Sequence, residues 1–254
     1  MILDKFKLDG KIALVTGASG GLGAAMAIAL AEAGADVACH GHREGNADET
    51  CSQIEAMGRR AFPVAGDMTD KSVPARIVDE VLEKLGHIDI LINNAGTIRR
   101  SPAAEYSEDD WSTVIEVNLS SVFRLSQAAG RKMIEQGSGK IVNIASLLSF
   151  QGGITVPAYA ASKSGVAGLT KALANEWARF NITVNAIAPG YMATNNTVAL
   201  RADETRNRQI LERIPAGRWG ESEDLAGAAV FLSSPASDYL NGHVLVVDGG
   251  WMGR

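Results

Sequence analysis

Short apolar segments alternate with longer amphipathic segments along the whole chain. Most of the apolar segments are continuous, which is typical of strands in a parallel sheet covered on both faces. The predicted strands are residues 12–16, 36–39, 60–65, 88–93, 140–145, 183–188 and 243–247. The predicted helices are residues 22–33, 46–57, 70–85, 107–135, 159–179, 200–213 and 222–233. This alternation predicts one doubly wound, Rossmann-like α/β domain over residues 1–254, with a seven-stranded, mostly parallel sheet and helices on both faces.

The carboxyl ends of the strands should lie at one edge of such a sheet, and ligands bind at that edge. Residues 189–221, which follow the sixth predicted strand, are the least regular part of the sequence. A long irregular segment in a compact domain is typical of a functional loop. We therefore expect residues 189–221 to form a substrate loop.

Composition and charge exclude several classes of function. The 254 residues include 24 basic and 29 acidic side chains, a net charge of −5, whereas a nucleic-acid-binding surface needs an excess of basic residues. The only two cysteines, Cys39 and Cys51, support neither a disulfide framework nor a metal site, so we expect a cytoplasmic protein. The long uncharged runs 141–162 and 180–200 are broken by polar residues and proline, so no membrane span is expected.

A glycine-rich turn follows the first predicted strand and leads directly into a helix. It contains Gly17, Ser19, Gly21, Leu22 and Gly23. Glycines permit a tight turn and a close approach to a pyrophosphate, and the free N–H groups of the helix start favour an anion. The spacing Gly-x-x-x-Gly-x-Gly differs from the common dinucleotide fingerprint, and a tight strand–helix connection is the alternative.

The residues after the second predicted strand bear on the choice of nucleotide. An acidic side chain there would bind a ribose 2′-hydroxyl, and a basic one would accept a 2′-phosphate. Residues 40–44 read His-Gly-His-Arg-Glu, so the acidic marker is missing, and Arg43 faces either phosphate or solvent. Asp67, at the end of the third strand, either receives an adenine amino group or caps the following turn.

Tyr159 and Lys163 lie four residues apart at the start of a predicted helix, so they share one face. A free tyrosine has a pKa near 10, and acid–base work near neutrality requires a pKa about two to three units lower. A nearby ammonium group together with the positive charge of a nicotinamide can supply a shift of that size. Many helices contain this spacing by chance, so the pair needs support from other residues.

Further polar residues are predicted at the same sheet edge. Ser146 ends the fifth strand, and Asn118 falls within an apolar helical stripe, where its amide must find partners, either in its own helix or elsewhere. Asn93-Asn94-Ala95-Gly96 closes the fourth strand and could bridge strand ends, with an asparagine-rich turn as the alternative. Pro189, Gly190 and Thr194 follow the sixth strand.

Together these residues resemble the short-chain dehydrogenases/reductases, and the resemblance covers essentially the whole chain. It implies an NAD(P)-dependent oxidoreductase in which Tyr159 exchanges a proton with the substrate oxygen and Ser146 hydrogen-bonds that oxygen. It also implies that Lys163 binds the nicotinamide ribose and lowers the pKa of Tyr159, and that Asn118 positions a water. The implied cofactor-binding residues are Gly17, Ser19, Gly21, Leu22, Gly23, Asp67, Asn94, Ala95, Gly96, Tyr159, Lys163, Pro189, Gly190 and Thr194.

Five further stretches resemble one branch of that family, the dehydrogenases of deoxy sugar acids such as 2-deoxy-D-gluconate and 2-keto-3-deoxygluconate. They are residues 97–100, 149–153, 189–197, 213–220 and 247–251. The branch implies NAD as the usual cofactor, and residues 41–43 leave NADP open. A sugar acid needs a cation for its carboxylate, which Arg99 or Arg100 could provide unless it is a solvated or subunit-bridging charge. Besides Ser146 and Tyr159, the candidate hydroxyl-binding residues are Gln151, Asn195 and Asn196.

Two competing functions remain at this stage. A 3-oxoacyl carrier-protein reductase of the same family would need a basic rim, which the charge of −5 does not favour. A non-catalytic nucleotide-binding module would not need Asn118, Ser146, Tyr159 and Lys163 together. The family resemblance further implies a homotetramer built on the helices at 107–135 and 159–179 and on the apolar chain end at 244–251.

Overall fold

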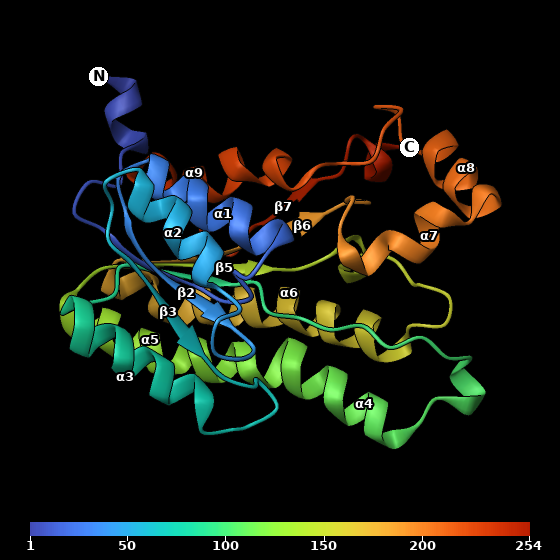
Figure 1. The fold of residues 1–254 in the computed structure, drawn as a ribbon, viewed down its shortest axis with the longest axis horizontal. Helices are drawn as coiled ribbons and strands as arrows, with labels where there is room; N and C mark the ends of the chain where they lie inside the picture. The colour runs from blue at the N-terminus through green and yellow to red at the C-terminus, as the bar shows by residue number, and fades with distance from the viewer.

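Seven strands form one sheet in the order β3-β2-β1-β4-β5-β6-β7 in the computed structural model, which describes residues 1–254 (Figure 1). Every neighbouring pair is parallel, so the predicted mostly parallel sheet is entirely parallel. The strands are β1 (Ile12–Val15), β2 (Asp36–Gly41), β3 (Ala61–Ala65), β4 (Ile90–Asn93), β5 (Gly139–Ile144), β6 (Ile182–Pro189) and β7 (Val244–Val247).

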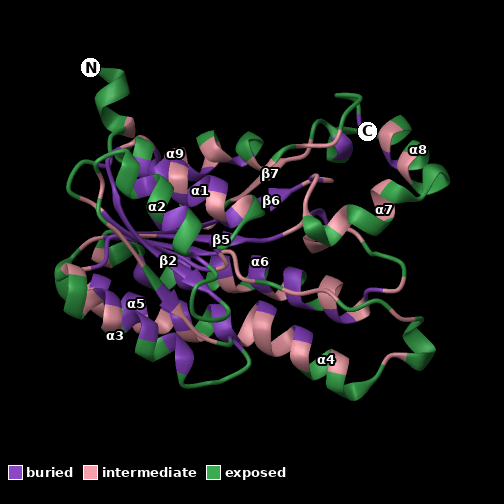
Figure 2. Ribbon diagram, in the orientation of Figure 1, coloured by how far each residue is buried: buried purple, intermediate pink, exposed green.

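Helices cover both faces of this sheet, which confirms the predicted doubly wound architecture (Figure 1). One face carries α1 (Gly21–Glu32), α2 (Asp48–Ala56) and α9 (Ala226–Ser233). The other carries α3 (Val73–Leu85), α4 (Glu108–Ile115), α5 (Ser121–Gln136) and α6 (Pro157–Trp177). Two large apolar clusters, one under each helical layer, form the core. Figure 2 shows the buried residues gathered in the sheet and on the helix faces that contact it.

The predicted helix at 107–135 is two helices joined by a single π-helical turn, Glu116–Ser120. This turn contains Asn118, which is completely buried. Single π turns inside helices often occur at functional sites, because the extra residue redirects one side chain. Trp111, in the first of the two helices, is 38% exposed.

The predicted helix at 200–213 is also divided. It forms α7 (Val198–Ala202) and α8 (Glu204–Arg213), which extend beyond the sheet edge (Figure 1). Asp203 separates them because its side chain accepts a hydrogen bond from the backbone N–H of Arg206 at 3.0 Å and so caps α8. The expected substrate loop therefore contains two short helices.

A buried polar network fixes β4, β5 and α6 relative to one another. The side-chain amide of Asn93 donates to Asn143 Oδ1 at 2.8 Å and to Ser126 Oγ at 3.0 Å, and Asn143 Nδ2 donates to Thr170 Oγ1 at 3.0 Å. All four residues are buried, where polar groups need such partners. The network thus positions α6, which carries Tyr159 and Lys163, against the sheet.

No helix of the structure combines the length and the apolar character that crossing a bilayer requires.

Candidate active site

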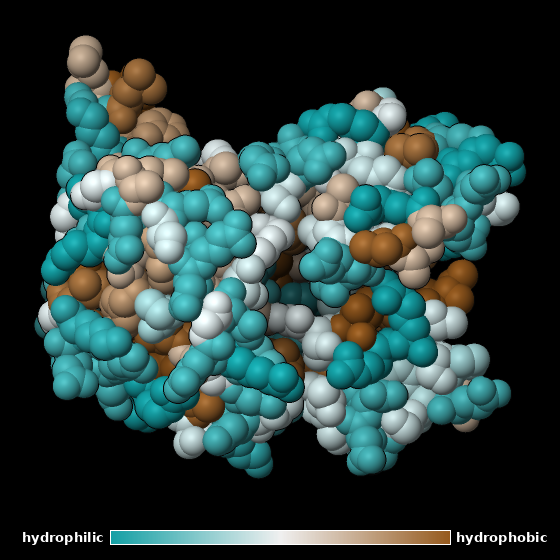
Figure 3. Space-filling view, in the orientation of Figure 1, coloured by the Kyte–Doolittle hydropathy of each residue, from teal (hydrophilic) through white to brown (hydrophobic).

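Two cavities meet at the carboxyl edge of the sheet. One, here called the glycine cavity, has a volume of about 670 Å³ and is lined by the turn after β1. The other, the arginine cavity, has a volume of about 660 Å³ and is lined by Arg100, Arg206 and Arg213. Tyr159 and Asn196 line both cavities, so a group bound in each would meet at Tyr159. Figure 3 shows the surface hollowed near the centre of this face.

The glycine turn forms one end of the glycine cavity. Gly17 has a φ of +65°, which favours glycine, and a Cβ on Gly23 would lie 2.1 Å from the carbonyl oxygen of Gly17. Helix α1 begins directly after Gly20, and no side chain caps it, so backbone N–H groups of its first turn remain available to an anion. Ser19, Leu22 and Gly23 line the cavity, whereas Gly21 does not. This cradle fits the pyrophosphate of a dinucleotide.

The end of β2 supplies two histidines to the glycine cavity that the sequence analysis did not select. His40 is 2% exposed; its Nδ1 accepts a hydrogen bond from the N–H of Gly17, and its Nε2 lies 2.9 Å from the carbonyl oxygen of Gly66. Burial lowers the pKa of His40, so the ring is neutral and Nε2 carries the proton that it donates to Gly66. His42 lines the same cavity, but Arg43 does not.

Asp67 and the segment after β4 also line this cavity. The Oδ1 atom of Asp67 accepts a hydrogen bond from the Thr69 N–H at 2.9 Å, which lowers the pKa of Asp67, so this residue both caps its turn and lines the cavity. Asn94 Nδ2 donates to the carbonyl oxygens of Thr16 and Gly17 at 2.9 and 3.1 Å. Asn94 therefore bridges the ends of β1 and β4, and Ala95, Gly96 and Thr194 line the cavity beside it.

Asn118 finds its partners outside its own helix. Its Nδ2 donates to the Thr97 carbonyl oxygen at 2.9 Å, and its Oδ1 accepts from the Thr97 N–H at 2.8 Å. A Cβ on Gly96 would lie 3.4 Å from Asn118 Oδ1 and 3.9 Å from Lys163 Nζ. The amide and the amine therefore flank the space that Gly96 leaves open.

Tyr159 and Lys163 share the first turns of α6, as their spacing predicts. The Nζ atom of Lys163 lies 5.7 Å from the centre of the Tyr159 ring and donates to the Ile144 carbonyl oxygen at 2.6 Å. Lys163 is 4% exposed, and burial lowers its pKa to about 8.

Burial raises the pKa of Tyr159, opposed by its hydrogen bond with Ser146 and by the charge of Arg100. The expectation that Lys163 lowers the pKa of Tyr159 stays a prediction. Desolvation opposes the charged form of each group.

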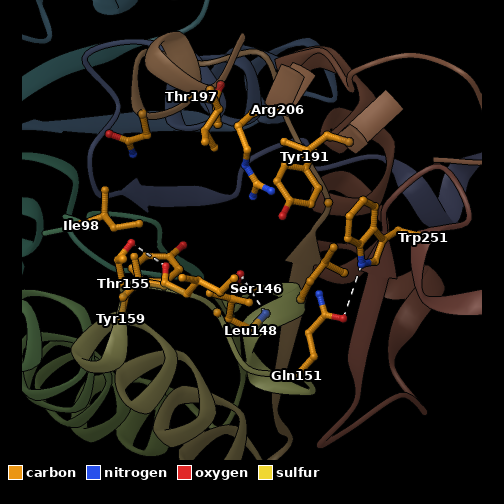
Figure 4. Close-up of a pocket in the computed structure, with 18 of the residues that line it drawn as sticks. Ile98, Ser146, Leu148, Gln151, Thr155, Tyr159, Tyr191, Thr197, Arg206 and Trp251 are labelled. Atoms are coloured by element: carbon orange, nitrogen blue, oxygen red, sulfur yellow. Dashed lines mark hydrogen bonds between the residues drawn. The ribbon is translucent and has the colours of Figure 1, made fainter. Parts of the chain in front are cut away.

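The arginine cavity is lined by three guanidinium groups and by no aspartate or glutamate, so its lining carries a net positive charge. Hydroxyl and amide side chains supply the remaining polar groups; they are Ser146, Gln151, Thr155, Tyr159, Tyr191, Asn196, Thr197 and Gln209. Figure 4 shows Arg206 and Thr197 on one side of the cavity, with Tyr159 and Ser146 on the other. Such a cavity can bind a polar anion.

Several predicted residues occupy other places. Arg99 lines the glycine cavity, donates to Thr97 Oγ1 at 2.9 Å and lies 3.4 Å from Asp110. Pro189 and Gly190, expected beside the cofactor, line the arginine cavity, and Asn195 lines neither cavity.

The sequence analysis did not select Arg206 and Arg213. The available signal was their spacing with Ile210, which places all three on one face of a helix.

Comparison with known proteins agrees with this geometry. The family model described as short chain dehydrogenase matches residues 11–205. Proteins named 2-dehydro-3-deoxy-D-gluconate 5-dehydrogenase from Dickeya dadantii and Escherichia coli are 56% and 57% identical, over the full length of both chains in each case. A crystal structure from Agrobacterium tumefaciens with bound NADP is 56% identical, has a TM-score of 0.92 and aligns over 98% of this chain and 99% of its own.

The family model spans most of the chain and includes the glycine turn, Asn118, Ser146, Tyr159 and Lys163. The relatives match from end to end. The chain therefore belongs to the short-chain dehydrogenase family.

Proposed function

We propose that this protein is an oxidoreductase that transfers a hydride between a nicotinamide dinucleotide in the glycine cavity and a six-carbon deoxy sugar acid in the arginine cavity. The observation that carries this proposal is the cavity with three arginines and no carboxylate that opens onto Tyr159 and Ser146. The relatives named for 2-dehydro-3-deoxy-D-gluconate support a substrate of this class. They do not favour the acyl carrier-protein reductase alternative.

Substrate contacts follow from the lining of the arginine cavity. Its guanidinium groups suit a carboxylate, and Gln151 and Asn196 suit sugar hydroxyls. Arg99 is left out of this proposal because it lines the other cavity and pairs with Asp110. Asn195 is left out because it lines neither cavity.

Tyr159 is proposed to hold the proton that moves during the reaction. When bound, the nicotinamide accepts or donates the hydride, and its oxidised form brings a positive charge. In the oxidative direction, the substrate hydroxyl gives its proton to the Tyr159 oxygen while the Ser146 hydroxyl hydrogen-bonds the same substrate oxygen. Lys163 is placed to bind the nicotinamide ribose, since it lines the glycine cavity beside Tyr159.

We propose that Asn118 positions a water molecule that takes part in a proton relay. Its Oδ1 and the Lys163 Nζ both face the space beside Gly96, within 4 Å of the position that a Cβ there would occupy. Any larger side chain at position 96 would fill that space. The double hydrogen bond to Thr97 holds the Asn118 amide in one orientation.

The glycine cavity is proposed to accept both NAD and NADP. NAD alone requires a carboxylate that binds the ribose 2′-hydroxyl and repels a 2′-phosphate. The end of β2 presents His40, Gly41 and His42 instead. The Oδ1 atom of Asp67 lies 3.8 Å from His42 Nδ1. The related crystal structure with bound NADP supports the acceptance of the phosphate.

A homotetramer remains part of the proposal. Trp111 on α4 is 38% exposed and Phe123 on α5 is 43% exposed, which leaves apolar surface on this pair of helices. The edge strand β7 is only half-buried along its whole length. These are the two surfaces that the sequence analysis expected to be subunit contacts.

Replacement of Tyr159 by phenylalanine tests the proposed reaction. We expect kcat with a sugar acid to fall about 10²- to 10⁴-fold, because the group that holds the proton is lost. Titration with the nucleotide should give an unchanged Kd, since only a hydroxyl is removed. Tyr239→Phe is the control, because Tyr239 is fully exposed and should leave turnover unchanged. A Tyr159→Phe protein that turns over normally would refute the mechanism.

Replacement of Lys163 by methionine should abolish turnover yet stabilise the protein at pH 7. The folded pKa of about 8 lies below the ordinary lysine value of 10.5, so at pH 7 the native state holds a buried ammonium at a cost. Allowing for the lost bond to Ile144, we expect the free energy of unfolding to rise by about 1–3 kcal/mol. As pH rises from 8 to 10.5, the wild-type native state releases this proton before the unfolded state does, so the difference should shrink.

Denaturant unfolding of both proteins between pH 7 and pH 10 measures this effect. Lys171→Met is the matched control, because Lys171 lies on the same helix but is exposed. Its free energy of unfolding should change by less than about 0.5 kcal/mol at every pH. A Lys163→Met protein that is less stable than wild type at pH 7 would contradict the burial argument.

Replacement of His42 by aspartate should move the preference toward NAD. The new carboxylate would accept the ribose 2′-hydroxyl and repel a 2′-phosphate, so the kcat/KM ratio of NAD to NADP should rise at least about tenfold. Arg43→Ala is the control, because Arg43 lies outside the glycine cavity and should leave the ratio unchanged. An unchanged ratio in the His42 variant, or a large change in the Arg43 variant, would place the phosphate elsewhere.

A further inference from the structure

We propose that Arg206 binds the substrate carboxylate at the wall of the arginine cavity opposite Tyr159, so that the protein selects acids whose carboxylate is remote from the reacting carbon. This inference rests on the proposed function and adds a specificity-determining residue to it. Arg206 lies on α8 and, in Figure 4, faces the cavity from the side opposite Ser146 and Tyr159.

Arg206, like Arg100 and Arg213, forms no ion pair within the chain. Its only side-chain hydrogen bond joins Nη1 to Gln209 Oε1, one turn along α8, at 3.0 Å, and it makes no ion pair. Its neighbour Arg208 lies 3.9 Å from Glu212 and does not line the cavity. An unpaired guanidinium that faces a cavity without carboxylates is suited to a bidentate contact with an anionic ligand.

The other two arginines of the cavity are engaged differently. Arg100 Nη2 donates to the Asn196 carbonyl oxygen at 3.3 Å, and its charge acts on the phenol of Tyr159, so it stands at the reacting end. The Arg213 guanidinium lies 4.0 Å from the centre of the Trp251 ring, where the cation–π contact holds it against the wall.

Helix α8 is anchored well enough to position Arg206. Ile210, one turn after Arg206, is buried in an apolar cluster with Leu147 and Trp251. On the same helix, Asn207 Oδ1 accepts a hydrogen bond from the indole N–H of Trp219 at 2.7 Å. These contacts fix the rotation of α8 about its axis, so Arg206 and Ile210 face inward.

The position of Arg206 predicts a preference for one arrangement of the substrate. The reacting carbon must lie at Tyr159 and Ser146, while the carboxylate lies against the opposite wall. A short 2-hydroxy acid, whose carboxylate is attached to the reacting carbon, cannot occupy both places. A hexonate that reacts several carbons away from its carboxylate can.

Kinetics with a charged and a neutral substrate test this proposal. For Arg206→Gln, we expect kcat/KM with 2-dehydro-3-deoxy-D-gluconate to fall about 10- to 100-fold, mainly through KM, because a charge-assisted bond is lost. With the carboxamide of the same substrate, the change should stay within about threefold. Arg206→Lys should recover part of the loss with the acid, and Arg208→Gln should behave as wild type.

The possible failures are distinguishable. Equal losses with the acid and the carboxamide would show a merely structural role and overturn the proposal, as would no loss with either. A wild-type protein that prefers lactate to the hexonate would also overturn it. If the wild-type protein turns over no sugar acid with either nucleotide, the proposed function itself fails, and the assignment of Arg206 fails with it.

Discussion

The pairing of the buried Lys163 with the half-buried Tyr159 on one turn of α6 is the constraint on which the proposed chemistry depends. Lys163 is almost completely removed from water, and burial lowers its pKa to about 8, while burial raises the pKa of Tyr159. Burial therefore opposes the charged form of each group. A positive charge delivered to the glycine cavity would favour the phenolate, because an opposite charge nearby favours the charged form. Cofactor binding and activation of the acid–base group are thereby linked.

The parallel sheet brings the residues of the candidate site together. Residues from the ends of β1, β4 and β5 and from the first turns of α6 meet within one region because all seven strands are parallel. The buried hydrogen bonds of Asn93, Asn143 and Thr170 fix the position of α6 relative to the sheet. The π turn adds Asn118 to the same region. Helices α7 and α8, which line the arginine cavity, lie outside this frame.

Local patterns in the sequence predicted much of the fold and the centre of the site. Apolar runs predicted all seven strands, and the separation of four residues placed Tyr159 and Lys163 on one face of a helix. The π turn was not predictable in this way, because it accompanies a contact between Asn118 and Thr97 that exists only in the folded chain. The burial of Lys163 was not predictable either, because burial is a property of the packed structure.

Motif analysis also could not identify Arg206, the residue that we propose binds the carboxylate. Arg99 and Arg100 are adjacent in a loop, and only the fold shows that they face different cavities. Arg206 belongs to the predicted helix at 200–213, but the sequence alone did not show which face of that helix lines a cavity. Its role depends on the absence of an acidic partner, which only three-dimensional contacts show.

The most direct test of the central claim is a titration of Tyr159 itself, followed by the tyrosinate difference absorption of wild type minus Tyr159→Phe. In the free protein, this signal should appear above pH 10, the ordinary value for tyrosine, because burial opposes ionisation. With saturating oxidised nucleotide, it should move below that value. A signal at the same pH with and without the nucleotide, or one already below pH 10 in the free protein, would contradict the account.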